Sequence, residues 1–254
     1  MNRLFDEASC TTTAAPSARV EQARVRRLGH RGEDFSLFAP LHYEANYAYP
    51  LVVWLHNEGG DQRQLARVMP LVSMRNYVGL AVRGPEACET GGYAWPQTTD
   101  GIAAAEQRIC DAIDKAGERY HIHDQRIYLA GYEAGGTMAY RVALRNPQRF
   151  SAAVSLGGPF PEGETPLAKL AQLRKFPLLL AHCRDSQSYP VEQVCRELML
   201  FHAAGLAVTL RQYPCGDELT TQMLTDLDVW LMEQVTGQAV REQLATAEQP
   251  SDWN

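Results

Sequence analysis

The sequence lacks the marks of several protein classes. Its 254 residues contain no run approaching the ~20 apolar residues that a membrane-spanning helix needs. Its lysines and arginines are scattered and its net charge is −6, so there is no basic surface for nucleic acid or an anionic membrane. Its six cysteines show neither a C-x-x-C pair nor metal-ligand spacing. We therefore expect no nucleic-acid partner, no membrane association, no metal and no cofactor.

The beginning of the chain also lacks a secretion signal. Asp6 and Glu7 lie in the first stretch, which contains no apolar segment of the kind that such a signal needs. Because nothing directs the chain to an oxidising compartment, we expect a cytoplasmic protein with free thiols rather than disulfides.

Composition and length fit one globular domain. Hydrophobic residues make up 45% of the chain and charged residues 21%, as in ordinary soluble domains. An α/β domain of this length buries a large core. We place the domain at residues 21–235, after a flexible lead-in at 1–20 and before a polar tail at 236–254.

Strand patterns alternate with helix patterns along this domain. Residues 50–56 form a continuous apolar run, typical of a strand buried on both faces. Such alternation predicts an α/β fold with a mostly parallel central sheet and helices on both faces. The expected strands are 25–29, 34–38, 50–56, 77–82, 126–131, 151–156, 177–182 and 207–213, the expected helices are 62–75, 101–120, 134–145, 191–204 and 219–235, and a loop is expected at 84–97.

The segment RIYLAGYEAGG has the frame of a strand, a tight turn and a helix. In serine hydrolases such a turn has the pattern G-x-S-x-G and raises a nucleophilic serine above the sheet. Here the five residues are Gly131, Tyr132, Glu133, Ala134 and Gly135. Both glycines that permit the turn are present, but a carboxylate stands in place of the hydroxyl.

In the order of its elements and in four separated motifs, the chain resembles the α/β-hydrolase fold. The motifs are YPLVVWLHNEGG, RIYLAGYEAGG, PLLLAHCRDSQSYPVEQV and LRQYPCGDELT. They are similar to the patterns L-H-G-x-G, G-x-S-x-G, H-G-x-x-D-x-x-V-P and Y-x-x-x-H of the branch that holds carboxylesterases, phospholipases and polyhydroxybutyrate depolymerases. The resemblance covers residues 34–235 and implies an esterase-like site on this fold.

The same resemblance implies where the three catalytic positions lie. Glu133 occupies the nucleophile position and Ser186 the acid position, with Asp185 one residue earlier. Asp217 occupies the position of the catalytic histidine. The catalytic triad is thus substituted, and loss of the imidazole is the most damaging change, because the imidazole takes the proton of the nucleophile and returns it to the leaving group.

The resemblance further implies an oxyanion loop at His56 and Asn57, facing the backbone N–H of Ala134. His56 and His182 match framework positions of the family. We therefore expect structural roles for both histidines rather than a role as catalytic base.

Three hypotheses follow for such a site. The leading one is a pseudoenzyme with a binding or structural role, in which the Glu133 carboxylate fills the oxyanion hole at the positive end of a helix. The second is a hydrolase that uses Glu133 as a carboxylate nucleophile with Asp217 nearby, since dehalogenases and epoxide hydrolases of this fold use an aspartate at the elbow. The third is an acidic cleft in which Glu133, Asp217 and either Asp185 or Glu58 share a proton or hold a divalent cation.

Aromatic residues offer candidates for ligand contact. The loop residues Tyr93, Trp95, Phe160 and Pro161 are expected near the mouth of the cleft, where they could bind an apolar ligand or simply roof the core. Tyr132, Tyr93 and Trp95 are the candidate ligand contacts. The partner would be an unidentified small molecule or protein. Homodimerisation is common among soluble proteins, but nothing in the sequence selects an interface.

Overall fold

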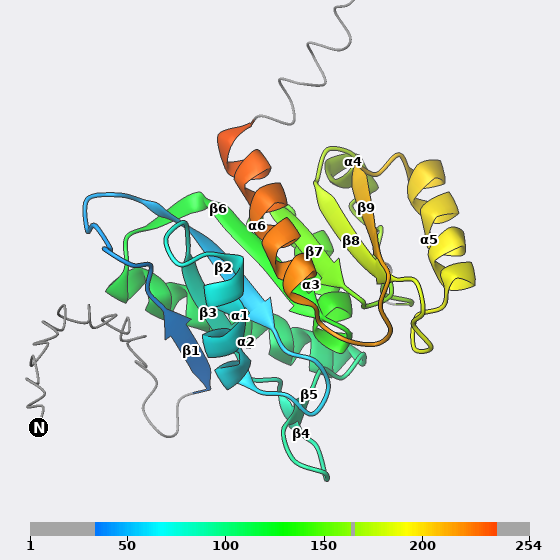
Figure 1. The fold of residues 1–254 in the computed structure, drawn as a ribbon, viewed down its shortest axis with the longest axis horizontal. Helices are drawn as coiled ribbons and strands as arrows, with labels where there is room; N and C mark the ends of the chain where they lie inside the picture. The colour runs from blue at the N-terminus through cyan, green and yellow to red at the C-terminus, as the bar shows by residue number, and fades with distance from the viewer. Residues whose placement is uncertain (1–33, 164–165, 238–254) are drawn as a thin grey trace, which may run out of the picture.

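A seven-stranded sheet forms the centre of the molecule in the computed structural model, which describes residues 34–163 and 166–237 (Figure 1). Its strands are β1 (Phe35–Phe38), β2 (Tyr49–Leu55), β3 (Val78–Val82), β6 (Ile122–Tyr132), β7 (Ala152–Leu156), β8 (Leu178–Cys183) and β9 (Val208–Tyr213). Their order is β1-β3-β2-β6-β7-β8-β9, and only β1 pairs antiparallel to its neighbour. The predicted mostly parallel α/β sheet is confirmed.

Helices cover both faces of this sheet. They are α1 (Leu65–Val72), α2 (Thr99–Arg119), α3 (Ala134–Arg145), α5 (Val191–Ala204) and α6 (Thr221–Thr236). Every residue of β2 is buried, and its side chains alternate between two cores. Leu51 and Val53 belong to the core under α2, α3 and α5, whereas Val52 and Trp54 belong to the core under α1 and α6. Figure 1 shows α1 and α6 together on one face of the sheet.

Local signals in the sequence set several helix ends. The hydroxyls of Thr98 and Thr220 accept backbone hydrogen bonds in the first turns of α2 and α6. Gly205 and Gly237 follow α5 and α6 at positive φ, the backbone region that glycine adopts without steric cost. The expected bounds of the helices at 134–145 and 191–204 are confirmed.

Other expected boundaries were wrong. The helix expected at 62–75 is a 3₁₀ turn, η1 (Gln62–Gln64), followed by α1, and it ends when Ser73 turns to an extended backbone. The expected loop at 84–97 contains a small hairpin of β4 (Glu86–Ala87) and β5 (Tyr93–Ala94). A short helix that was not predicted, α4 (Leu170–Leu173), lies between β7 and β8. The strand expected at 25–29, the lead-in at 1–20 and the tail beyond 237 lie outside the described residues.

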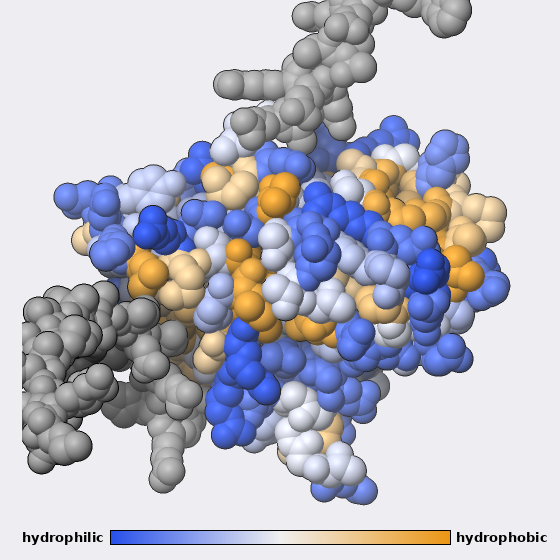
Figure 2. Space-filling view, viewed as in Figure 1, coloured by the Kyte–Doolittle hydropathy of each residue, from blue (hydrophilic) through white to orange (hydrophobic). Residues whose placement is uncertain are grey.

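The surface of the described part is mostly polar, with local apolar areas (Figure 2). Apolar side chains are exposed beside the edge strand β9 and on α5, where Met199, Leu200 and Leu210 are at least 40% accessible. Within the described ranges, no helix has the length and apolar character needed to cross a membrane.

Candidate functional site

The turn between β6 and α3 has the geometry of a nucleophile elbow. Glu133 stands alone between the two elements with φ 48° and ψ −118°, a backbone conformation that costs a non-glycine residue of order 1–3 kcal/mol. The turn needs glycine on both sides. A Cβ on Gly131 would lie 2.3 Å from the carbonyl carbon of Gly135, and a Cβ on Gly135 would lie 2.2 Å from the carbonyl oxygen of Leu55. The structure therefore contains the elbow that the glycine spacing predicts.

The loop after β2, which we expected to be the oxyanion loop, lies in close contact with Gly135 at the start of α3. A Cβ at this position would lie 2.4 Å from the carbonyl oxygen of His56. The loop after β2, which carries His56 and Asn57, thus packs against the first turn of α3, where Ala134 lies half-buried. The carbonyl of His56 thus lies against the start of α3.

The Glu133 carboxylate has a partner that the sequence did not predict. Its side chain makes no capping hydrogen bond to α3. Instead, it forms a hydrogen bond with the side chain of Tyr132. The pKa of Tyr132 is raised well above its usual value, first by burial of its hydroxyl and then by the negative charge of Glu133 and this hydrogen bond. Because the raised pKa keeps the phenol protonated, Tyr132 acts as the donor to the carboxylate.

The acid and histidine positions are occupied by a hydrogen-bonded pair. Ser186 follows β8, Asp217 follows β9, and the Ser186 hydroxyl donates to Oδ1 of Asp217. The backbone N–H groups of Gln187 and Ser188 donate to Oδ2 at 3.1 and 3.3 Å. These donors, with the serine hydroxyl first, hold the pKa of Asp217 below its usual value. Asp217 is therefore an anion at neutral pH.

Asp185 takes no part in this pair. Its side chain is 62% accessible and accepts from Nε of Arg184 at 3.3 Å. Of the two residues considered for the acid position, Ser186 is the one that faces Asp217. The negative charge of Asp217 also contributes to the raised pKa of Tyr132, so the pair and the elbow lie within electrostatic reach of each other.

The acidic residues do not assemble into a metal site. In the part of the chain that the structure describes, no group of three or more His, Cys, Asp and Glu side chains could hold a metal ion. Glu58 is exposed on the loop after β2 and Asp185 pairs with Arg184. The hypothesis that Asp185 or Glu58 joins Glu133 and Asp217 in a cation site therefore gains no support from the described residues.

Both histidines are held in the core by hydrogen bonds. Nε2 of His56 accepts the backbone N–H of Gly84 at 3.0 Å, so its proton lies on Nδ1, which donates to the carbonyl of Asn57 at 2.7 Å. Burial lowers the pKa of His56. His182 is also fully buried, and its Nε2 lies 3.0 Å from the carbonyl of Tyr189. Both rings are thus engaged by backbone groups inside the core, and their structural rather than catalytic role stays a prediction.

The aromatic candidates divide between core and surface. Trp95 is 4% accessible, donates its indole N–H to the carbonyl of His56 at 2.8 Å and packs on the His56 ring. It roofs the core, which is one of the two roles that the sequence left open for it. Tyr93 is half-buried, with the Arg83 guanidinium over its ring at 4.6 Å, and Tyr132 is committed to Glu133.

One element of the site was missed from the sequence. Gly158, directly after β7, lies under the elbow, where a Cβ would be 2.1 Å from the carbonyl oxygen of Glu133. The Ser155 hydroxyl donates to the carbonyl of Gly158 at 2.6 Å and holds this loop in place. The glycine doublet at 157–158, immediately after a buried strand, was the available signal.

Comparison with known proteins places this geometry in a family. A model of the phospholipase/carboxylesterase family matches residues 93–233, which is more than half of the chain. The chain belongs to the phospholipase/carboxylesterase family. The elbow, with Glu133 at its apex, lies within the matched residues.

Individual family relatives are distant. NocK of Nocardia uniformis subsp. tsuyamanensis, a candidate esterase, is 27% identical over 175 residues, which cover 68% of this chain and 48% of NocK. The chain thus spans about half the length of that relative. Acyl-protein thioesterase 2 of Zea mays superposes with a TM-score of 0.64 at 18% identity, over 79% of this chain and 98% of the other. Esterase PE8 superposes with a TM-score of 0.63 at 22% identity, over 78% and 96%. These structures establish the shared α/β-hydrolase fold.

Proposed function

We propose that this chain is a non-hydrolytic member of its family, with a binding or structural role. The observation that supports this best is the pair at the acid and histidine positions. Ester hydrolysis on this fold needs a group that takes a proton from the nucleophile and returns it to the leaving group. Asp217 is held as an anion of lowered pKa by three hydrogen-bond donors, so it is a poor proton acceptor at neutral pH.

No other side chain near the elbow supplies the missing base. His56 and His182 are buried and hydrogen-bonded to backbone groups inside the core. The Tyr132 phenol keeps its proton because its pKa is raised. Ser155, whose hydroxyl lies against Gly136 of α3, is fully buried and donates to a backbone carbonyl. The frame of an esterase is thus combined with side chains that do not move protons.

The alternative is an esterase-like or depolymerase-like hydrolase with a carboxylate site. Glu133 is partly accessible at the apex of the elbow, which is where a nucleophile must stand. In this version Glu133 would attack the substrate, and Asp217 would have to activate water for the second step. Because the pKa of Asp217 is lowered, Asp217 would be a poor base for this activation of water, so the second step argues against this alternative.

Hydrolysis of a panel of short-chain aryl esters separates the two functions. We expect no turnover above buffer for the wild type, Glu133→Ala or Glu133→Ser. Wild-type turnover that disappears in Glu133→Ala would overturn the proposal and make Glu133 catalytic, and turnover that survives in Glu133→Ala would overturn it by placing the chemistry elsewhere.

A rebuilt triad provides the positive control. The triple substitution Glu133→Ser, Ser186→Asp and Asp217→His places the family's three side chains on a frame that is otherwise intact. We expect this variant to gain measurable hydrolysis, whereas each single substitution gains none, because members of a triad act as a unit. A folded triple variant without any gain would show that more than side-chain chemistry separates this chain from its active relatives.

The partner of a non-hydrolytic protein would be a small molecule or another protein, in a reducing cytoplasm where its thiols stay free. In the described ranges five cysteines are present and all are free, which fits such a setting.

A further inference from the structure

Two cysteines lie where the loops that carry Ser186 and Asp217 begin. Cys183 is the last residue of β8, Cys215 follows β9, and both belong to the core under α1 and α6. The strands β8 and β9 lie side by side (Figure 1), and Cys183 stands opposite Tyr213 in their register. Neither thiol has a part in the proposed function, so an inference from this pair holds whether or not the elbow is silent.

Two backbone hydrogen bonds hold Cys215 against the end of β8. The N–H of Cys215 donates to the carbonyl of Tyr213 at 3.0 Å, so the chain makes a tight turn at Pro214. The N–H of Asp185 donates to the carbonyl of Cys215, also at 3.0 Å. Cys215 therefore lies beside the end of β8, and its side chain lies in the same core as that of Cys183.

The side chains of the two cysteines are in contact. A hydrogen bond joins the two thiols, and Sγ of Cys183 also lies 3.8 Å from the carbonyl oxygen of Glu218 in the loop after β9. Burial, and after it the contact with Cys215, raises the pKa of Cys183 to about 12, so both sulfurs are not ionised together at neutral pH. Two sulfurs in hydrogen-bond contact need little further approach to form a disulfide.

Access from solvent differs among the thiols. Cys183 is 2% accessible and Cys215 is 9% accessible, whereas Cys195 on α5 is exposed. A bulky reagent therefore meets Cys195 first. A small neutral oxidant such as hydrogen peroxide needs less room, and Cys215 is the member of the pair that offers it more.

We propose that Cys183 and Cys215 are a dithiol that a peroxide converts into a reversible disulfide. In the first step the sulfur of Cys215 takes up one peroxide oxygen as a sulfenic acid, and one water leaves. In the second step the sulfur of Cys183 attacks the sulfenic sulfur, the S–S bond forms and a second water leaves. The two thiols together lose two electrons and two protons, and the peroxide takes up both. A reducing thiol reverses the change.

This disulfide would join the loop after β8 to the loop after β9. Ser186 and Asp217, which lie on these two loops, would then be held together by a covalent link as well as by their hydrogen bond. The link closes the chain between residues 183 and 215 and so restricts the unfolded state. In a reducing setting the pair remains two thiols, as in the structure, and disulfides in such settings are transient and respond to oxidants.

Peptide mapping of the full-length folded protein tests the link. After treatment with hydrogen peroxide and blocking of the remaining thiols, trypsin separates the two cysteines at Arg184 and Arg211, so only a disulfide keeps their peptides together. We expect the linked peptide of Cys183 and Cys215 in the wild type and its loss on reduction with dithiothreitol. Cys215→Ser should abolish it, and Cys195→Ser, which removes the exposed thiol, should leave it unchanged.

Thermal unfolding provides a second readout. The oxidised wild type should melt at least about 5 °C above the reduced wild type, because the cross-link restricts the unfolded chain. Cys215→Ser should show no such rise after the same treatment. Dithiothreitol should return the oxidised wild type to the melting temperature of the reduced protein.

Three outcomes would overturn the proposal. One is oxidation of Cys195 without a peptide that links Cys183 to Cys215, since the oxidant would then have acted and the pair would not have closed. Another is a linked peptide that is no more abundant than other cysteine pairs, which would indicate unspecific cross-linking. The last is an oxidised wild type that melts at or below the temperature of the reduced protein, which would mean that the disulfide does not fit the folded structure.

Discussion

The elbow at Glu133 and the pair of Ser186 and Asp217 differ in what holds them in place. Backbone packing fixes the elbow, because Gly131, Gly135 and the loop after β2 leave no room for another turn. Side-chain hydrogen bonds fix the pair, because Asp217 lies in an exposed loop and is held by the Ser186 hydroxyl and two backbone N–H groups.

This difference teaches that two parts of one site can depend on different interactions. The glycines on either side of Glu133 set the backbone of the elbow. The pair depends on its side chains, because the Ser186 hydroxyl has to donate and the Asp217 carboxylate has to accept. We therefore expect the two parts to respond differently to substitution.

Breaking the backbone of the elbow should have the largest effect. Gly135→Ala introduces a Cβ 2.2 Å from the carbonyl oxygen of Leu55, so backbone atoms of β2 or α3 must move. We expect a loss of at least about 3 kcal/mol in the free energy of unfolding, or failure to fold, measured by urea denaturation.

Gly117→Ala in α2 is the matched control for that substitution. A Cβ there meets no atom within 4 Å, so alanine should stabilise the helix by roughly 0.5–1 kcal/mol. If Gly135→Ala were as harmless as Gly117→Ala, the elbow would not be held by its backbone.

Relieving the strain at the apex should have an intermediate effect. Glycine adopts the φ of 48° at position 133 without the cost that a side chain carries, whereas alanine keeps that cost. Both Glu133→Gly and Glu133→Ala remove the hydrogen bond to Tyr132. We expect Glu133→Gly to be about 1 kcal/mol more stable than Glu133→Ala, visible as a higher Tm by calorimetry. Equal melting temperatures would show that the apex is not strained.

The same contrast explains how much could be predicted from the sequence. Glycine spacing and cap residues report backbone geometry directly, so the elbow and the bounds of α3 and α5 could be predicted. The positions of Ser186 and Asp217 followed from motif order, since loops after neighbouring parallel strands meet at one edge of the sheet.

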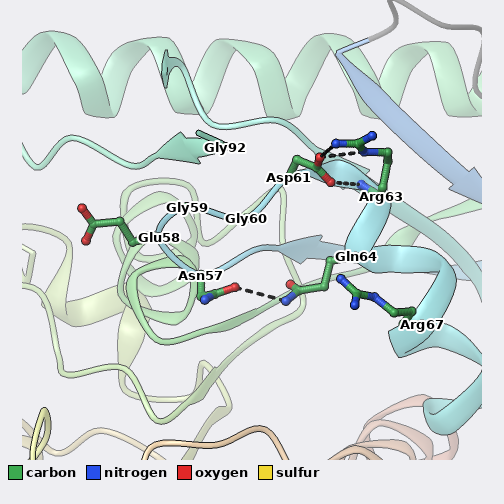
Figure 3. A pocket seen from close by; sticks show the side chains of 9 residues that line it. All are labelled: Asn57, Glu58, Gly59, Gly60, Asp61, Arg63, Gln64, Arg67 and Gly92. Atoms are coloured by element: carbon green, nitrogen blue, oxygen red, sulfur yellow. Dashed lines mark hydrogen bonds and ion pairs between the residues drawn. The ribbon is translucent and has the colours of Figure 1, made fainter. Parts of the chain in front are cut away.

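Side-chain partners could not be predicted in this way. The contact of Glu133 with Tyr132 depends on which way two adjacent side chains turn. The hydrogen bonds from Trp54 to Gln64 and from Gln64 to Asn57, the second of which is drawn in Figure 3, depend on how η1 packs over the end of β2. Neighbouring positions in a motif do not fix such packing, so the sequence left open whether Trp95 binds a ligand or roofs the core, and in the structure it is buried.

Removing the charge of the pair should have the smallest effect, and pH should reveal it. The pKa of Asp217 is lowered in the folded state, so its ionised form adds stability above the unfolded value of 3.8, and this contribution is lost as pH falls through the folded pKa. Because Asp217 is exposed, we expect wild type to exceed Asp217→Asn by a few tenths to about 1 kcal/mol at neutral pH, in urea unfolding. The gap should close as pH falls below 3.8 and through the folded pKa, since the wild-type carboxylate then takes up its proton. Asp185→Asn, which removes an exposed carboxylate with only Arg184 as its partner, should show a smaller gap at neutral pH. A gap for Asp217→Asn that persisted in acid would mean that the shape of the side chain, and not its charge, holds the loop to Ser186.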